Sequence, residues 1–144
     1  MQKNEPIMIF HAFIDPAGVT EVRSGHEAVT LIPFRATVAS PLFTGETAPG
    51  AVDVQQENAA GLRSLCARYA FRGTDEAGKP CTLFVENCGW IQTGRQDPVL
   101  PTCSRFLTDS PVLAPYLSQH RFRAEVHGTD RGVDIHVYDV EAGS

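Results

Sequence analysis

The sequence lacks the features that mark a nucleic-acid-binding or a membrane protein. Its 144 residues include 12 lysines and arginines against 17 acidic residues, for a net charge of -5, and the basic residues are scattered. Nucleic acids and anionic membranes attract clustered positive charge, so neither is expected as a partner. No apolar stretch approaches the roughly 20 residues that span a bilayer. The first ten residues also lack the pattern of a signal peptide, so we expect a cytoplasmic protein.

Motifs for binding phosphates, for serine hydrolysis and for catalytic zinc are absent as well. The chain contains no Gly-rich phosphate loop, no nucleophile elbow and no His-Glu-x-x-His segment. We therefore expect neither a cofactor nor a metal.

The cysteines contain no Cys-x-x-Cys pair and match no zinc spacing. Without an export signal, we expect reduced thiols, mostly buried as small hydrophobic side chains. A structural disulfide is the less favoured alternative. A nucleophilic Cys88 stays open, although no base stands beside it in the sequence. The four cysteines are Cys66, Cys81, Cys88 and Cys103.

What the sequence does contain is a series of short runs rich in Val, Ile, Phe, Tyr and Thr. Turn signals separate these runs at intervals of about 8 to 15 residues, which is typical of an antiparallel β-sandwich or β-barrel. A chain of this length fits one domain and can bury roughly 70% of its unfolded surface. We predict a single all-β domain over residues 1–144.

Two pairs of segments are predicted to form β-hairpins, because a short loop containing glycine separates the members of each pair. These pairs are residues 62–73 with 81–91, and residues 121–127 with 133–140.

One short helix is expected near residues 111–119. Asp109 and Ser110 offer a cap, and Pro111 suits the first helical position. Residues 55–68 have partial helical propensity, but Gly61 and the alternation after it favour a turn followed by a strand. The proline-bearing stretch 93–102 is predicted to be a loop.

Polar residues interrupt several of the predicted strands. Asp53 and Gln55 are two positions apart, so they share one face of a strand. Such a pair usually faces solvent, and an enclosed pocket is the alternative. Asn87 shares its face with apolar residues, and leaving a buried amide unpaired costs about 1–3 kcal/mol. We therefore expect Asn87 to contact another wall residue, a water or a ligand.

The last two predicted strands carry alternating polar residues that most simply face solvent. If the sheet closes, one polar stripe lines the interior instead, and His127 and His136 approach each other across the hairpin. A metal site formed by these histidines and a carboxylate is a less favoured alternative.

Six motifs occur in an order that resembles the family called domain of unknown function 3237, which consists of small, mainly bacterial proteins. The resemblance covers about residues 30–141, nearly the whole chain. Departures from the family pattern are Gly50-Ala51-Val52 where Gly-Gly often precedes the aspartate, Val54 for an aromatic residue and Tyr116-Leu117-Ser118 for Trp-Leu-Asn. The motifs are Phe43-Thr44-Gly45, Pro49-Gly50-Ala51-Val52-Asp53-Val54-Gln55, Ala67-Arg68-Tyr69, Val85-Glu86-Asn87-Cys88-Gly89, Arg105-Phe106 and Val137-Tyr138-Asp139-Val140.

The resemblance implies one antiparallel β-barrel of roughly eight to ten strands around a central cavity. It also implies that Asp53, Arg68 and Asn87 are polar groups of that cavity. Their chemistry suits proton transfer, with Asp53 as acid and base and with Arg68 and Asn87 stabilising a developing oxyanion. The residues expected to bind substrate are Gln55, Tyr69, Trp90, Arg105 and Tyr138.

Two functions follow from these expectations. The first is a cofactor-independent isomerase, cyclase or lyase that acts on a small, partly apolar carbonyl compound. The alternative is a non-catalytic barrel that binds a small molecule. Because barrels of this size often pair through an outer face, a homodimer is also expected.

Overall fold

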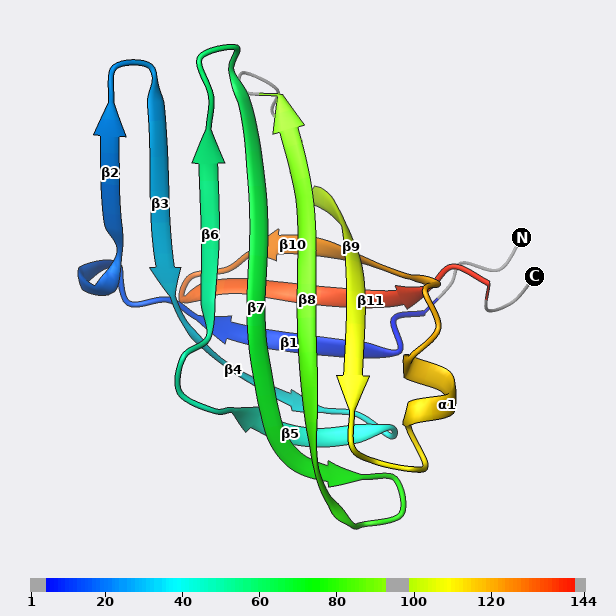
Figure 1. The fold of residues 1–144 in the computed structure, drawn as a ribbon. Helices are drawn as coiled ribbons and strands as arrows, with labels where there is room; N and C mark the ends of the chain where they lie inside the picture. The colour runs from blue at the N-terminus through cyan, green and yellow to red at the C-terminus, as the bar shows by residue number, and fades with distance from the viewer. Residues whose placement is uncertain (1–4, 93–98, 142–144) are drawn as a thin grey trace.

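The computed structural model describes residues 5–92 and 99–141, and their strands form one antiparallel sheet that curls into a barrel (Figure 1). The helical segments in this part of the chain are a single 3-10 turn, η1 (Pro16–Gly18), and one turn of α-helix, α1 (Ala114–Leu117). None of the described helices is long and apolar enough to cross a membrane. The strands are β1 (Met8–Phe13), β2 (Thr20–Ser24), β3 (Glu27–Pro33), β4 (Arg35–Ala39), β5 (Phe43–Thr47), β6 (Val52–Glu57), β7 (Leu62–Asp75), β8 (Pro80–Gln92), β9 (Val99–Thr108), β10 (Phe122–Gly128) and β11 (Gly132–Asp139).

Eight of these strands close the barrel in the order β7-β5-β4-β1-β11-β10-β9-β8, and β8 pairs back with β7. The remaining three, β6, β3 and β2, extend the sheet outward from β7. In Figure 1 this extension continues the wall of β7 and β8, while β1, β10 and β11 cross behind it at a steep angle. The predicted all-β barrel with one short helix is confirmed, and the sandwich alternative is wrong.

Strand β7 belongs to both parts because it changes partner along its length. Its first half pairs with β6, as far as Arg68, and its second half pairs with β5 from Phe71 onward. At the crossing of β5 and β7, Gly45 lies opposite Gly73. A Cβ atom on Gly73 would collide with the backbone oxygen of Thr44. Glycine therefore allows the close approach that closes the barrel.

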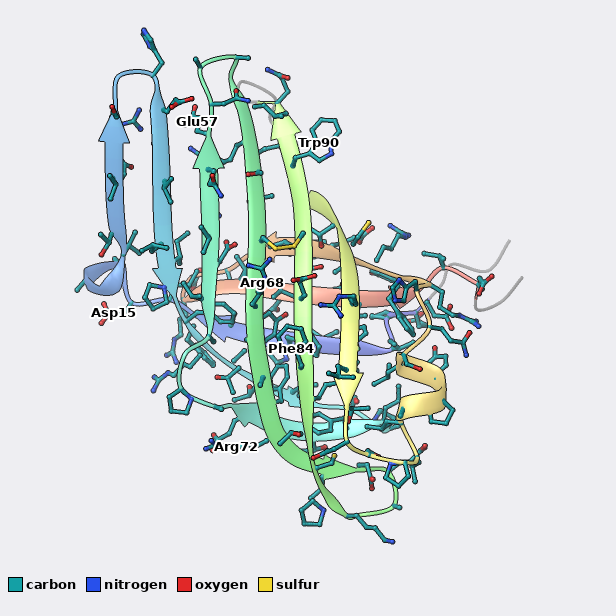
Figure 2. All side chains as sticks on the ribbon, in the orientation of Figure 1. Asp15, Glu57, Arg68, Arg72, Phe84 and Trp90 are labelled. Atoms are coloured by element: carbon teal, nitrogen blue, oxygen red, sulfur yellow. A yellow bond between two sulfur atoms is a disulfide. The ribbon has the colours of Figure 1, made fainter. Side chains whose placement is uncertain are left out.

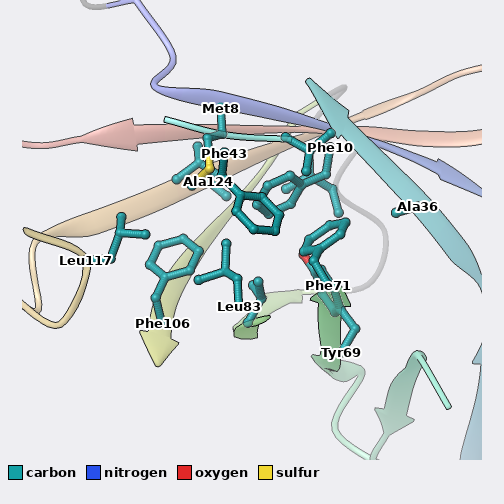
Figure 3. Packing of buried hydrophobic residues seen from close by; sticks show 14 of the residues in the cluster. Met8, Phe10, Ala36, Phe43, Tyr69, Phe71, Leu83, Phe106, Leu117 and Ala124 are labelled. Carbon is teal, nitrogen blue, oxygen red and sulfur yellow. The ribbon is translucent and has the colours of Figure 1, made fainter. Parts of the chain in front are cut away.

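Aromatic side chains fill the half of the barrel that β5 and the second half of β7 enclose (Figure 3). The rings of Phe10 and Phe71 lie 4.9 Å apart between centroids, and Phe43 packs edge-on against Phe71. Leu83 and Phe106 continue this packing from β8 and β9, both nearly without exposure. Because this half is solid, any cavity must lie toward the other half of β7.

The predicted hairpins are confirmed as β7–β8 and β10–β11, and the strand preferred in the region of residues 55–68 is confirmed as β6, a turn and the start of β7. The predicted helix shortens to the single turn α1. Pro115 occupies its first turn, so the helix does not extend back toward Pro111. The loop predicted over 93–102 is wrong from Val99 onward, where β9 begins. Residues 93–98 lie outside the described part of the chain.

The prediction of four reduced cysteines is wrong for two of them. Cys66 and Cys88 lie directly opposite each other on β7 and β8, with Cα atoms 4.1 Å apart, and form a disulfide. Cys81 is a buried free thiol and Cys103 an exposed one. Sequence spacing did not show this pair, because only the register of the hairpin brings the two cysteines together.

Candidate functional site

One row of the sheet brings the predicted acid and the predicted amide to the same side of the wall. Ile32 pairs with Asp53, Asp53 with Ala67, and Ala67 with Asn87. Residues paired directly across neighbouring strands point to the same face, so these four side chains share the inner face. Asp53 and Asn87 stand two strand spacings apart, roughly 10 Å. Between them Ala67 is small, which leaves space in front of it.

That space is a cavity of about 140 Å³ at the end of the barrel opposite the aromatic core. A single water molecule needs only about 10–15 Å³ of such space, so the cavity has room for a small organic molecule. The wall is mostly apolar, with a few polar groups, as is usual for a small-molecule site. The apolar lining residues are Ala12, Ile14, Ile32, Phe34, Leu65, Ala67, Val126, Val133 and Ile135, and the polar ones are Asp53, Gln55, Asn87 and Thr102.

The carboxyl group of Asp53 lies in an apolar surrounding, and only one of its two oxygens is hydrogen-bonded to a described residue. Nε2 of Gln55 donates a hydrogen bond of 2.9 Å to its Oδ2. Its Oδ1 is buried and has no hydrogen-bond partner among the described residues. Burial raises the pKa of the Asp53 carboxyl above its ordinary value, and the bond from Gln55 lowers the pKa by less. Asp53 can therefore hold or release a proton closer to neutral pH than an exposed aspartate.

Gln55 is itself oriented by charged groups at the rim. Its Oε1 accepts a 3.4 Å hydrogen bond from Nη1 of Arg63, and Nη2 of Arg63 lies 3.2 Å from Oε2 of Glu57. The amide oxygen thus faces Arg63, which turns the NH2 group toward Asp53. Gln55 is a positioning residue for the acid.

Asn87 presents a donor because its acceptor is already occupied. Its Oδ1 accepts hydrogen bonds from Oγ1 of Thr102 at 2.7 Å and from Oγ of Ser104 at 2.8 Å. Among the described residues no acceptor bonds its Nδ2. Because the two hydroxyl groups fix the orientation of the amide, the N–H groups are available to an acceptor in the cavity.

Tyr69 also points inward but lies deeper than the cavity lining, with its ring 5.0 Å from that of Phe34. Its hydroxyl is buried and has no hydrogen-bond partner in the described part of the chain. Burial, and to a lesser degree the nearby Asp53 charge, raise the pKa of this phenol, so it keeps its proton. Tyr69 is near the site without lining it.

The other predicted site residues point away from the cavity, to the outer face of the sheet. Strand alternation puts Ala67 and Tyr69 inside, so Arg68 is outside, where its Nε lies 2.7 Å from Oε2 of Glu86 (Figure 2). Arg105 pairs with Oε1 of the same glutamate at 3.3 Å. The prediction that these two arginines serve the cavity is wrong.

Two aromatic residues are corrected for the same reason. Trp90 is 66% exposed near the end of β8 in Figure 2. Tyr138 alternates with the inward Val137 and stacks outside against Arg123, whose guanidinium lies 5.2 Å from the ring centroid. Neither residue is among those that line the cavity.

His127 and His136 approach each other, with ring centroids 4.4 Å apart, but on the outer face of β10 and β11. In the described part of the chain, the group of side chains close enough to share a metal is instead Cys66, Glu86 and Cys88. Its two cysteines are already bonded to each other.

The two hydroxyl residues that hold Asn87 did not emerge from the sequence. A signal was present, since Thr102 and Ser104 alternate with Cys103 and Arg105 in the manner of a strand. The loop assigned up to residue 102 concealed it. Ile32 and Phe34, which also line the cavity, carry only the apolar alternation that every core strand shows.

Comparisons with known proteins support the fold and no more. No family model and no curated protein matches the chain. Solved structures do match. One is a protein with unknown function from Clostridium acetobutylicum ATCC 824, with a TM-score of 0.74 and 21% identity over 96% of this chain and 97% of that one.

Two further structures match to a similar extent. A conserved protein of unknown function from Rhodopseudomonas palustris has a TM-score of 0.72 and 23% identity over 94% of both chains. A beta-barrel like protein from Acinetobacter baumannii AYE has a TM-score of 0.70 and 20% identity, also over 94% of both chains. At this identity the matches establish the barrel, while the resemblance to domain of unknown function 3237 stays a prediction.

Replacing Asp53 by asparagine is expected to stabilise the protein by about 1 kcal/mol at pH 7, because the variant no longer buries an incompletely bonded charge. The folded-state pKa is raised above the ordinary 3.8, so the penalty appears as the pH rises from 3.8 through the folded-state pKa. Urea unfolding of both proteins at pH 3.5 and pH 7 measures the difference, which should be largest at pH 7. A variant that is less stable than the wild type at pH 7 would contradict the buried-charge interpretation. The exposed change Glu21→Gln is the control.

Proposed function

We propose that the cavity binds a small, partly apolar carbonyl compound and that Asp53 transfers a proton on it without a cofactor. The reaction class is that of an isomerase, cyclase or lyase. One observation supports this most strongly. A buried carboxyl oxygen and an amide donor, neither with a hydrogen-bond partner among the described residues, line one small apolar cavity from the same wall, about two strand spacings apart.

The chemistry follows from these two groups. Asp53 removes a proton from the carbon next to the substrate carbonyl, and negative charge develops on the carbonyl oxygen. Nδ2 of Asn87 donates a hydrogen bond to that oxygen, and Thr102 and Ser104 keep the amide in place. Asp53 then returns the proton to another position or to a leaving group. The apolar wall strengthens both interactions by excluding water.

A second candidate is a barrel that binds a small molecule without reacting with it. The outward position of Arg68 favours this candidate, because the described residues that line the cavity include no lysine or arginine to stabilise an anion. A ligand would then be held by Asn87 and by the protonated Asp53 as two hydrogen-bond donors.

An exchange experiment distinguishes the two candidates. The protein is incubated in D2O with a panel of small cyclic and open-chain ketones, enones and β-keto esters, and deuterium uptake next to the carbonyl is followed by NMR. We expect uptake with at least one compound, and a roughly 100-fold slower rate for Asp53→Asn at unchanged binding. The control Arg68→Ala, on the outer face, should keep the wild-type rate.

Each other outcome has a defined meaning. Unchanged uptake in Asp53→Asn would overturn the assigned base. Binding without uptake, measured by chemical-shift changes of the barrel, would favour the second candidate.

Membership of domain of unknown function 3237, a homodimer and a cytoplasmic location stay predictions and belong to this proposal. Disulfides are rare in reducing compartments such as the cytoplasm, so the Cys66–Cys88 bond counts against the predicted cytoplasmic location.

A further inference from the structure

Three cysteines form one row on the outer face of three neighbouring strands. Cys66 on β7 pairs in register with Cys88 on β8, and Cys88 pairs with Cys103 on β9. The neighbours of each cysteine point inward, since Ala67 and Asn87 line the cavity and the residues beside Cys103 bond to Asn87. Strand alternation therefore places all three sulfur atoms on the opposite, outer face.

The row contains both reactants of a thiol–disulfide exchange. Cys66 and Cys88 are joined by the sulfur–sulfur bond that Figure 2 shows between β7 and β8, close to Arg68. Cys103 is a free thiol and is exposed. An accessible thiol thus stands in the next strand, directly opposite one sulfur of a disulfide.

Backbone geometry allows Cys88 to bond either neighbour. The 4.1 Å between the Cα atoms of Cys66 and Cys88 identifies a close pair without backbone hydrogen bonds. A strand residue directs its N–H and C=O to one side, so Cys88 directs them to β9. Its pairing with Cys103 is then the wider, hydrogen-bonded type, with Cα atoms about 5.5 Å apart. Disulfides commonly join Cα atoms about 4.4–6.8 Å apart.

We propose that Cys66, Cys88 and Cys103 form a thiol–disulfide exchange site on the outer face of the barrel. The thiolate of Cys103 attacks Sγ of Cys88, the Cys88–Cys103 bond forms and the Cys66–Cys88 bond breaks. Cys66 leaves as a thiolate and takes up the proton that Cys103 gave up. The number of disulfides is unchanged, so the step needs no oxidant or reductant.

The exchange moves the covalent bridge from between β7 and β8 to between β8 and β9. Cys88 is the residue after Asn87, so both positions of the bridge lie directly behind the amide of the cavity. The barrel wall behind Asn87 therefore has two isomeric covalent states, one with the Cys66–Cys88 bridge and one with the Cys88–Cys103 bridge.

Labelling of the wild-type protein tests the proposal. The protein is first equilibrated with glutathione disulfide to complete the bridge, freed of glutathione, and then incubated at pH 8 with iodoacetamide without denaturant. Trypsin separates Cys66, Cys88 and Cys103 into different peptides, because arginines stand between them at positions 68 and 95. We expect label on both Cys103 and Cys66, each in a population that lacks label on the other. Label on Cys103 alone, or a stable glutathione adduct without an internal bridge, would overturn the proposal.

Two variants make the result independent of labelling rates. In Cys66→Ser, equilibrated in the same way, mass spectrometry should show a bridge between Cys88 and Cys103, and two free thiols there would refute the exchange. In Cys103→Ser, the label on Cys66 should disappear. Cys81 is buried, so Cys81→Ala should label as the wild type does, and circular dichroism confirms that each variant is folded.

Discussion

Gly73→Ala is expected to lower the free energy of unfolding by about 3 kcal/mol or more, and to prevent accumulation of folded protein at 37 °C. A Cβ on Gly73 would meet the backbone oxygen of Thr44 and the Cα of Gly45. Both are backbone atoms, so no side-chain rotation relieves the collision. Either β5 moves away from β7 and loses ladder hydrogen bonds, or the crossing is strained.

Urea unfolding followed by tryptophan fluorescence and circular dichroism measures this loss. The matched control is Gly128→Ala, since a Cβ at Gly128 would have nothing within 4 Å. That variant should lie within about 0.5 kcal/mol of the wild type. Equal stability of the two variants would show that the crossing of β5 and β7 can relax.

Asp139→Ala is expected to cost about 2–3 kcal/mol, because it removes the buried partner of Arg121, which keeps the exposed Glu141 at 3.2 Å. The Asp139 side chain is 2% exposed, and its Oδ1 lies 2.7 Å from Nε of Arg121. Its Oδ2 accepts a 2.6 Å hydrogen bond from the hydroxyl of Tyr116 on α1. The substitution therefore releases α1 from the end of β11 as well as breaking the ion pair.

The same carboxylate gives the protein a predictable acid response. Burial raises the pKa of Asp139, but the hydrogen bonds from Arg121, Tyr116 and the backbone N–H of Glu141, with the Arg121 charge, outweigh it and lower the pKa to about 2 from an ordinary 3.8. Since the folded-state pKa is the lower one, the stabilisation is complete above pH 3.8 and is lost as the pH falls toward 2. The stability difference between wild type and Asp139→Ala should thus shrink over this interval. Urea midpoints between pH 2 and pH 7 measure it, with the exposed change Asp130→Ala as the control.

The local elements of the barrel were accessible from the sequence because each rests on a short-range signal. Glycine-containing loops predicted the two hairpins, and Gly61 separated β6 from β7. The branching of β7 was not accessible. It depends on Gly45 meeting Gly73, two residues far apart in the chain whose pairing only the closed sheet reveals.

The candidate site, too, was predictable from the sequence only in part. Asp53 and Gln55 were expected to share a face, and they do, because alternation within one strand fixes that relation. Which face of β7 turns inward depends on the register with β6 and β8, which alternation alone leaves open. Arg68 and Tyr69 are adjacent in the chain, so they could not both enter the interior. Tyr69 packs in the aromatic core, and the guanidinium of Arg68 pairs with Glu86 on the outer face.

The extension of β6, β3 and β2 has one more consequence. It supplies the carboxyl group, whereas the strands that close the barrel supply the carboxamide and its two hydroxyl supports. Side chains on β2, β3 and β6 can change without altering the pairing of β7 with β8 that closes the barrel. In such a fold, the chemistry can diversify on the added strands while the stability of the closed barrel is conserved.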